Sequence, residues 1–197
     1  MKIITLLTLL TLTTVLSQTV SAAKTVLAGG CFWCMESDFE ALKGVSDVVS
    51  GFTGGSVVNP TYGGDHSGHY EAVEITYDPE VVSYQGLLDH FWVNIDPFDA
   101  IGQFCDKGHS YLSAIFVANA EERALAQKSK QRTVDMFPGQ TVVTPILDAM
   151  TFYPITGDES YHQDYYKTNS LRYKAYRWGC GRDKRLKQIW GDRVTTH

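Results

Sequence analysis

Two cysteines and two glycines stand close together near the start of the chain, in the stretch Gly29-Gly30-Cys31-Phe32-Trp33-Cys34. The apolar residues 25–27 before them predict a strand, and the residues after them fit a helix. Glycines between a strand and a helix permit a tight turn. Cys31 would then lie in the first turn of the helix, where unpaired N–H groups and the helix dipole favour an anion. This is a suitable position for a reactive thiolate.

The helix end by itself would change this thiol only modestly. The dipole contributes roughly 0.3–1 kcal/mol, and up to about 2 kcal/mol in a partly buried site. Since about 1.4 kcal/mol corresponds to one pKa unit, the pKa of Cys31 would fall by about one unit from its usual ~8.5. Cys31 would be only partly ionised at neutral pH, so other groups must assist the chemistry.

The cysteines allow several interpretations, and they occupy positions 31, 34, 105 and 180. In an exported chain, two structural disulfides are the simplest interpretation. A C-x-x-C after a strand also suits a thioredoxin-like dithiol oxidoreductase, although Trp33 lies between the two cysteines and Phe-Trp is a bulky pair. A zinc site could use His66 and His69, but these lie in a glycine-rich loop and no second C-x-x-C exists. No metal site is predicted.

The elements that must position these residues form a mixed pattern. Strands are predicted at residues 45–52, 71–77, 113–117 and 142–152, and helices at residues 84–94, 119–133 and 158–178. Strands outnumber the helices between them, which favours an open α+β sandwich over a doubly wound parallel sheet. Two long loops, residues 51–70 and 96–111, carry polar and aromatic side chains, and long loops inside a compact domain are usually functional.

Residues 1–23 have the layout of a secretory signal peptide, with Lys2, an apolar run and small residues before a cleavage point. Residues 24–197 are the size of one domain. We therefore expect an exported protein, periplasmic or extracellular, that has no membrane segment after cleavage. The hydrophobic fraction of 44%, the charged fraction of 20% and the net charge of −5 are ordinary for a globular protein and give no reason to expect nucleic acid.

Four motifs, in order along most of the chain after residue 23, are similar to those of the type A peptide methionine sulfoxide reductases. They are Gly30-Cys31-Phe32-Trp33, Asn59-Pro60-Thr61-Tyr62, Gly68-His69-Tyr70-Glu71-Ala72-Val73 and Asp106-Lys107-Gly108-His109-Ser110-Tyr111. The resemblance implies reduction of methionine-S-sulfoxide, free or in proteins, to methionine in the repair of oxidised proteins. It also implies a two-layer α/β sandwich, a single domain whose mixed sheet has ferredoxin-like character.

The resemblance implies that Cys31 is the nucleophile, and the family's other active-site positions coincide with Glu71, Tyr62, Tyr111 and Asp106. A sulfoxide sulfur is a poor electrophile until its oxygen is protonated or strongly hydrogen-bonded. Glu71 would be the acid if burial raises its pKa above ~4.3, and the two tyrosine hydroxyls would hold the oxygen. Glu71 and Cys31 would then share a proton and titrate as a pair.

An apolar wall for the substrate methyl group is expected from Phe32 and Trp33. Burial of such a group contributes roughly 0.8 kcal/mol. These two side chains are therefore the predicted substrate-binding residues.

After the attack Cys31 becomes a sulfenic acid, which needs a second thiol to resolve it. Cys180 is favoured for this role because glycines on both sides would let it move, and Cys34 and Cys105 remain alternatives. The resulting intramolecular disulfide would be reduced by a thioredoxin-like partner, so an external thiol reductant is expected and no bound cofactor. We expect a monomer, with the basic residues after position 181 on a solvated helix face. The alternative is an exported binding or structural domain with two static disulfides.

Overall fold

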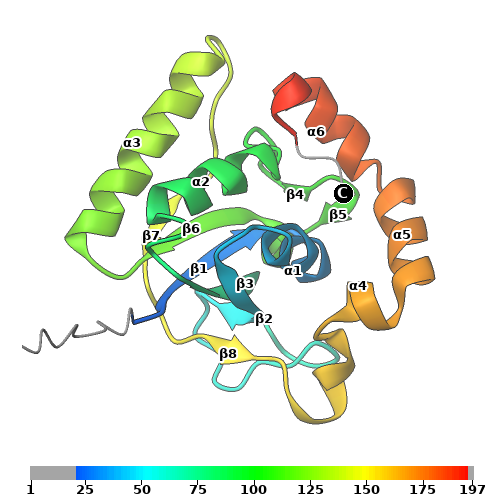
Figure 1. Ribbon diagram of the computed structural model, residues 1–197. Coiled ribbons are helices and arrows are strands. Elements are labelled where there is room, and N and C mark those ends of the chain that lie inside the picture. Colours follow the sequence, from blue (N-terminus) through cyan, green and yellow to red (C-terminus); the bar gives the residue numbers. More distant parts are fainter. Residues whose placement is uncertain (1–20, 195–197) are drawn as a thin grey trace, which may run out of the picture.

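The computed structural model describes residues 21–194, so the predicted signal segment lies almost entirely outside the described residues. A six-stranded sheet forms the centre, with strand order β7-β6-β1-β3-β2-β8 (Figure 1). Its strands are β1 (Ala23–Gly29), β2 (Val45–Thr53), β3 (Tyr70–Tyr77), β6 (Ser113–Val117), β7 (Ile146–Asp148) and β8 (Tyr153–Pro154). Neighbouring strands are antiparallel except β6 and β7, which are parallel. The predicted mixed sheet is confirmed.

The central part of the chain has the order β1, α1 (Phe32–Glu40), β2, β3, α2 (Tyr84–Val93), β6. Strand β3 lies between β1 and β2, and β6 lies on the far side of β1. Each helix therefore crosses over a strand that pairs with both of its flanking strands. This is the split β-α-β arrangement of a ferredoxin-like fold, and the prediction of a single α+β domain is confirmed.

Both edges of this core are extended. Helix α3 (Ala120–Met136) follows β6 and leads to β7, which lengthens one edge, and β8 lengthens the other beside β2. A separate two-stranded ribbon, β4 (Gly102–Gln103) and β5 (Asp106–Lys107), precedes the short 3-10 helix η1 (His109–Tyr111). The edge strands of the six-stranded sheet, β7 and β8, are thus short. Long exposed edge strands would favour pairing with another chain.

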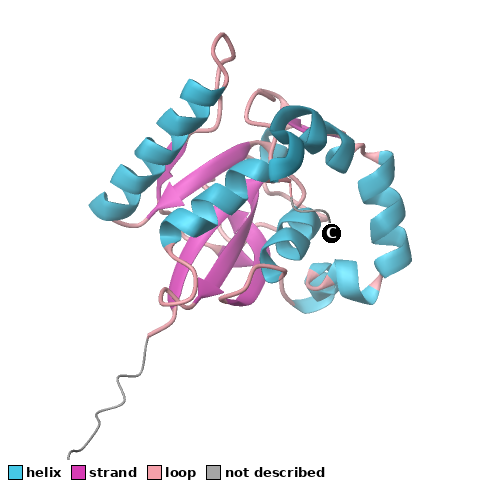
Figure 2. Cartoon of the chain, turned by 45° about the horizontal axis from the view of Figure 1, so that its top comes forward, coloured by secondary structure: helices cyan, strands magenta, loops and turns pink. Residues whose placement is uncertain are grey.

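The C-terminal segment, residues 157–193, runs along one side of the molecule, outside α1 and away from α3 (orange to red in Figure 1; also Figure 2). It consists of η2 (Gly157–His162), α4 (Tyr165–Thr168), α5 (Ser170–Gly179), α6 (Arg182–Trp190) and η3 (Gly191–Arg193). Helix α4 packs against α1, and α5 continues into α6 through Cys180 and Gly181. This segment thereby covers the helix that follows Cys31.

Two predicted elements differ from the structure. The strand predicted at 142–152 is reduced to β7, because Pro145 has no N–H for a ladder and the chain leaves the sheet after Asp148. The helix predicted at 158–178 is divided into η2, α4 and α5. Asp164 has φ 53°, in the left-handed region, and this conformation interrupts a right-handed helix.

The core lies between the sheet and helices α1 and α2. Alternation along the strands directs Leu27, Val73, Ile75 and Ile115 to the side of Phe39 and Leu88, and all of these side chains are fully buried. The opposite face of the sheet carries a smaller cluster around Ala28, Ala72 and Phe116. Within residues 21–194, no helix has both the length and the apolar character needed to cross a membrane.

Candidate active site

Two glycines shape the turn that presents Cys31. A Cβ atom on Gly29 would lie 2.3 Å from Met35 Sδ, and one on Gly30, which has φ +83°, would lie 2.5 Å from Gln103 Cβ. Only glycine accommodates both the close approach and the left-handed conformation. Cys31 is therefore held as the N-cap residue of α1, which begins at Phe32.

The register of the sheet brings residues distant in sequence to this turn. Leu27 pairs with Val73 on β3, so Glu71 lies two residues further along, beside the end of β1. Gly29 pairs with Ser113 on β6, and Tyr111 lies two residues before Ser113, at the end of η1. Since β1 is antiparallel to β3 and β6, β1 ends where those two strands begin. The Glu71 carboxyl and the Tyr111 phenol therefore reach Cys31.

All seven residues predicted for catalysis and substrate binding line one cavity of about 60 Å³. Its lining residues are Cys31, Phe32, Trp33, Tyr62, Glu71, Asp106, Tyr111 and Tyr176. Tyr62 comes from the loop 51–70, and Asp106 and Tyr111 come from the loop 96–111, so both long loops contribute to the Cys31 cavity. Tyr176, from α5, was not predicted.

Glu71 is an acid enclosed by protein. Its side chain is 3% exposed, and Oε2 accepts a hydrogen bond of 3.1 Å from the backbone N–H of Phe32. Burial raises the pKa of Glu71 to about 8, and the hydrogen bond from Phe32 opposes part of this effect. Glu71 is therefore protonated at neutral pH and can donate a proton into the cavity.

Cys31 and Cys34 are both free thiols, they are buried, and their side chains are hydrogen-bonded to each other. Burial, then the neighbouring Cys34, raises the pKa of Cys31 well above its usual value. The prediction that the helix end would lower this pKa is therefore wrong, because desolvation outweighs the dipole. The hydrogen bond from Cys31, helped by the charges of Arg182 and Arg177, lowers the pKa of Cys34 to about 7. The two thiols share a proton and titrate as a pair.

The two predicted tyrosine donors remain protonated. Burial, then the nearby Glu71 carboxyl, raises the pKa of Tyr62 to about 12, and the same causes raise the pKa of Tyr111. Glu159 holds the loop of Tyr62 in place by accepting hydrogen bonds of 2.7 Å from the backbone N–H groups of Tyr62 and Gly63. Both hydroxyls are thus positioned donors for an oxygen atom in the cavity.

Aromatic side chains enclose the apolar wall formed by Phe32 and Trp33. The Trp33 indole N–H donates to His162 Nδ1 at 3.0 Å, and the Tyr165 ring stacks on Trp33 with centroids 3.9 Å apart. His162 also lies against the Tyr62 ring, at 4.0 Å. The sequence analysis does not identify His162 or Tyr165. It predicts one helix over residues 158–178, whereas the structure divides this region into η2, α4 and α5.

The remaining two cysteines form a disulfide, Cys105–Cys180, with Cα atoms 4.9 Å apart. This differs from the expected bridge between Cys31 and Cys180. The ribbon that carries Cys105 and the end of α5 meet beside the cavity, which brings Cys180 to Cys105, and the resolving role of Cys180 stays a prediction. The structure also differs from the alternative of two static disulfides, since Cys31 and Cys34 are unbridged.

A buried ion cluster anchors the C-terminal helices to α1. Asp38 pairs with Arg177 at 2.7 Å and with Arg182 at 3.4 Å, and Arg182 also donates to the carbonyl of Asn94 at 2.7 Å. Arg182 is only 2% exposed. The prediction that the basic residues after position 181 line a solvated helix face is therefore wrong for Arg182, because these acceptors replace water around its guanidinium.

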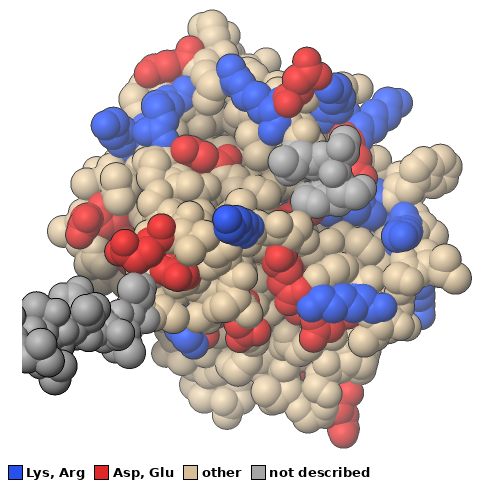
Figure 3. All heavy atoms as spheres, viewed as in Figure 1, with Lys and Arg blue, Asp and Glu red and all other residues tan. Residues whose placement is uncertain are grey.

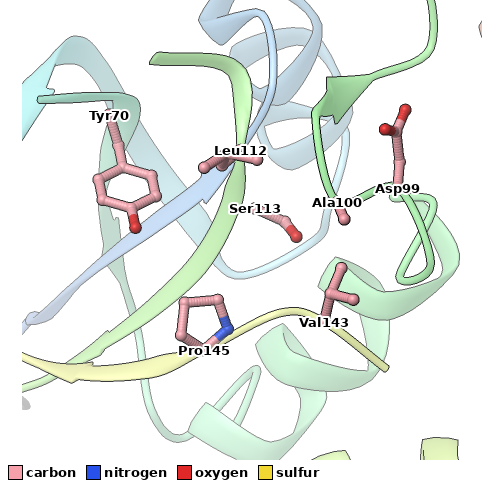
Figure 4. Close-up of a pocket in the computed structure, with 7 residues that line it drawn as sticks. All are labelled: Tyr70, Asp99, Ala100, Leu112, Ser113, Val143 and Pro145. Atoms are coloured by element: carbon pink, nitrogen blue, oxygen red, sulfur yellow. The ribbon is translucent and has the colours of Figure 1, made fainter. Parts of the chain in front are cut away.

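A second cavity, of about 160 Å³, lies away from Cys31 and is shown in Figure 4. Two of its polar groups have partners within the protein, since the Ser113 hydroxyl bonds Thr144 and Asp99 is paired with Lys107. The histidines considered for zinc, His66 and His69, contact backbone carbonyls instead of the cysteines. Neither feature adds a group to the Cys31 cavity.

Comparison with known proteins identifies relatives over nearly the whole described range. The sequence profile of the family described as "Peptide methionine sulfoxide reductase" matches residues 23–194. "Peptide methionine sulfoxide reductase MsrA 2" of Caulobacter vibrioides is 51% identical over 178 residues, which cover 87% of this chain and 89% of that protein. "Peptide methionine sulfoxide reductase MsrA" of Bacillus subtilis is 47% identical over 169 residues, which cover 83% of this chain and 93% of that protein.

Solved structures show the same fold. Methionine sulfoxide reductase A of Corynebacterium diphtheriae superposes with a TM-score of 0.67 at 28% identity and covers 78% of each chain. Mxr1 from Saccharomyces cerevisiae in reduced form gives a TM-score of 0.68 at 26% identity, covering 76% of this chain and 86% of that one.

Proposed function

Because the chain belongs to the peptide methionine sulfoxide reductase family, and is thus a thiol-dependent oxidoreductase, we propose that it reduces methionine-S-sulfoxide through the Cys31 cavity. The observation that supports this site best is the meeting of Cys31, Glu71 and the hydroxyls of Tyr62 and Tyr111 around one cavity. It combines a nucleophile, a neutral acid and two hydrogen-bond donors, which are the groups that sulfoxide reduction needs.

In the first step, the Cys31 sulfur attacks the sulfoxide sulfur while Glu71 gives a proton to the sulfoxide oxygen and takes up the proton that the Cys31 thiol loses. The hydroxyls of Tyr62 and Tyr111 hold that oxygen, and Phe32 and Trp33 enclose the methyl group. The oxygen is transferred, so the sulfoxide is reduced by two electrons to methionine and Cys31 is oxidised to a sulfenic acid. A protonated Glu71 avoids placing a second negative charge beside the attacking sulfur.

In the second step, the Cys34 thiol attacks the sulfenic acid, which forms a Cys31–Cys34 disulfide and releases water. The support for Cys34 is its hydrogen bond to Cys31, whereas Cys180 is bonded to Cys105. A C-x-x-C pair at the start of a helix is also a common arrangement for a reversible disulfide. This assignment replaces Cys180 with Cys34 as the resolving residue.

In the third step, the Cys105 and Cys180 thiols reduce the Cys31–Cys34 disulfide by exchange and become the Cys105–Cys180 disulfide. The support for this exchange is that the inner pair is free and the outer pair is bridged, which is the pairing the exchange would produce. Gly179 and Gly181 have open space around them, which permits Cys180 to move. Cys105 is exposed, so a thioredoxin-like dithiol protein can reach the outer disulfide and complete the cycle.

The direct test is turnover of the separated S and R epimers of a methionine sulfoxide peptide with dithiothreitol. We expect reduction of the S epimer only, with Cys31→Ser inactive but folded as the control. Equal reduction of both epimers, or reduction by the Cys31→Ser protein, would contradict the proposal.

We further propose that the protein acts outside the cytoplasm, in the periplasm or the extracellular space. The support is the signal-like composition of residues 1–23. Figure 3 shows basic and acidic side chains interspersed on one face, with Lys and Arg most frequent over α3 and α6.

A further inference from the structure

Tyr176 belongs to none of the motifs found in the sequence, yet it lies in the Cys31 cavity. Its hydroxyl donates a short hydrogen bond to Asp106 Oδ2 and is also hydrogen-bonded to the Cys31 side chain. The hydroxyl of Tyr176 thus connects the nucleophilic sulfur to a carboxylate on β5.

Asp106 lies between Tyr176 and the outer disulfide. Its Oδ1 is 3.7 Å from Cys105 Sγ and its Oδ2 is 4.0 Å from Cys180 Sγ, distances at which a thiol can donate to a carboxylate. One carboxyl group therefore contacts both sulfur atoms of the outer pair and the hydroxyl that contacts Cys31.

We propose that Asp106 and Tyr176 form a proton path between the two cysteine pairs during their thiol–disulfide exchange. This inference rests on the proposed function, and within it Tyr176 becomes a catalytic residue of the exchange step. The path runs from Cys105 or Cys180 to Asp106, then to the Tyr176 hydroxyl and then to Cys31.

The exchange requires such a transfer because electrons and protons must both change places. The outer dithiol loses two electrons and two protons and forms the Cys105–Cys180 bond. The bond between Cys31 and Cys34 breaks, and each of these sulfurs gains one electron and one proton. As a carboxylate, Asp106 accepts the proton of one outer thiol and passes it to the Tyr176 hydroxyl as Tyr176 gives its own proton to Cys31. The proton of the second outer thiol follows the same path, and Cys31 gives one of the two protons to Cys34 across their hydrogen bond.

The surroundings of Cys31 and Cys34 favour a path through the protein. These side chains are 6% and 2% exposed, so bulk water has little access to either sulfur. Burial also raises the pKa of Asp106, which makes the protonated carboxyl easier to reach near neutral pH. Glu71 is the other nearby acid, and its proton serves the sulfoxide oxygen in the preceding step.

The test is a single turnover of fully reduced protein with one equivalent of a peptide that contains methionine-S-sulfoxide. Samples quenched with an alkylating reagent give two rates, for formation of methionine and for formation of the Cys105–Cys180 disulfide. In Tyr176→Phe we expect the ratio of the second rate to the first to fall at least about tenfold, since positioned proton donors typically contribute ~10²–10⁴-fold. Asp106→Asn should lower the ratio in the same direction.

Tyr166→Phe is the matched control, because Tyr166 also donates to a carboxylate, Glu40, but lies outside the cavity. It should leave the ratio unchanged, whereas Glu71→Gln should raise the ratio by slowing methionine formation. In the unmodified protein, deuterium oxide should slow the exchange, and this measurement does not depend on the folding of a variant.

An unchanged ratio in Tyr176→Phe, or no deuterium effect on the exchange, would overturn the proton path. The same holds if the unmodified protein makes methionine but never forms the Cys105–Cys180 disulfide. A protein that makes no methionine from the S epimer would instead overturn the proposed function, so the two failures are distinguishable.

Discussion

At Glu71, one carboxylate oxygen faces the backbone N–H of Phe32 while the rest of the side chain is enclosed by protein. The enclosure keeps the carboxyl neutral at a pH where an exposed glutamate would be ionised. The same enclosure raises the pKa of Cys31, so neither group is reactive alone. Their chemistry depends on moving a proton between them as the substrate oxygen leaves.

Glu71→Gln should slow methionine formation by ~10²–10⁴-fold, because the amide keeps the shape and hydrogen bonds but cannot deliver a proton. In the unmodified protein the acid form exists below the pKa of about 8, so the single-turnover rate should fall as pH rises through this value. The variant should lack that alkaline decline. Rapid-quench rates across this pH range test both expectations.

Tyr62→Phe and Tyr111→Phe provide the comparison. Each should slow methionine formation less than Glu71→Gln does, since either hydroxyl can partly replace the other in holding the sulfoxide oxygen. If both tyrosine variants were slower than the glutamate variant, the acid would have been assigned to the wrong residue.

Variants that stall within the catalytic cycle test the order in which the two disulfides form. With a thioredoxin-like protein as the only reductant, Cys180→Ser should make one methionine per enzyme and then stall with a Cys31–Cys34 disulfide. Dithiothreitol should restore its cycling, because a small dithiol can reduce the inner pair directly. Cys34→Ser should instead stop at the Cys31 sulfenic acid or form a bridge to another cysteine.

Peptide mapping of the stalled proteins distinguishes the two assignments. A Cys31 sulfenic acid that persists in Cys180→Ser, together with normal cycling of Cys34→Ser, would return the resolving role to Cys180.

Helix α1 is the element that links catalysis to the C-terminal segment. It carries Cys31 and Cys34 at its start, Glu36 in its middle and Asp38 one turn after Cys34. Asp38 holds Arg177 and Arg182 from α5 and α6, and Glu36 Oε1 accepts from the backbone N–H of Asp164 at 3.0 Å. The cysteine pair is therefore positioned by polar contacts with the start of α4 and with helices α5 and α6.

Glu36 should make the stability of the protein depend on pH. Its side chain is 1% exposed, and burial raises its pKa from 4.5 to about 8. The unfolded chain loses this proton near pH 4.5 and the folded protein loses it near pH 8. The free energy of unfolding should therefore fall as the pH rises from 4.5 to 8. The limit for one group is about 1.4 kcal/mol per pH unit.

Glu36→Gln should reduce this dependence, because glutamine keeps an acceptor for Asp164 but does not titrate. Urea unfolding at several pH values between about 5 and 8 measures the slope. A variant with the same slope as the unmodified protein would show that Glu36 is not the group responsible, although Glu71 contributes in the same direction.

The whole molecule combines a ferredoxin-like core with a C-terminal segment that closes over one side of it. The core presents Cys31, Glu71 and Tyr111 at one edge of the sheet, and the segment adds His162, Tyr165 and Tyr176. The site is complete only when the segment is docked. Loss of that docking should therefore reduce activity before the core unfolds.

Processing of the whole chain gives the last prediction. When the full sequence is produced in a bacterium with a secretion system, the mature protein should begin near Ala23 or Lys24 and be recovered outside the cytoplasm. Mass spectrometry and N-terminal sequencing of cell fractions measure this. An intact Met1 segment on a cytoplasmic protein would contradict the expected export.

The sequence by itself determined the reactive turn, the main strands and seven of the eight residues that line the cavity. Gly29, Gly30 and Cys31 define a local geometry, and short periodic runs such as residues 71–77 define strands, because these features depend on neighbours in the chain. The motifs of the resemblance supplied Tyr62, Asp106 and other lining residues that local reasoning could not connect.

Only the tertiary structure decided the pKa of Cys31, the partner of Cys180 and the burial of Arg182. Each depends on groups far away in sequence, such as Cys105 for Cys180 and Asp38 for Arg182, which are 75 and 144 residues distant. A helical pattern shows which residues are basic, but not whether an acid from another element replaces their water. Desolvation, like disulfide pairing, is a property of the packed chain.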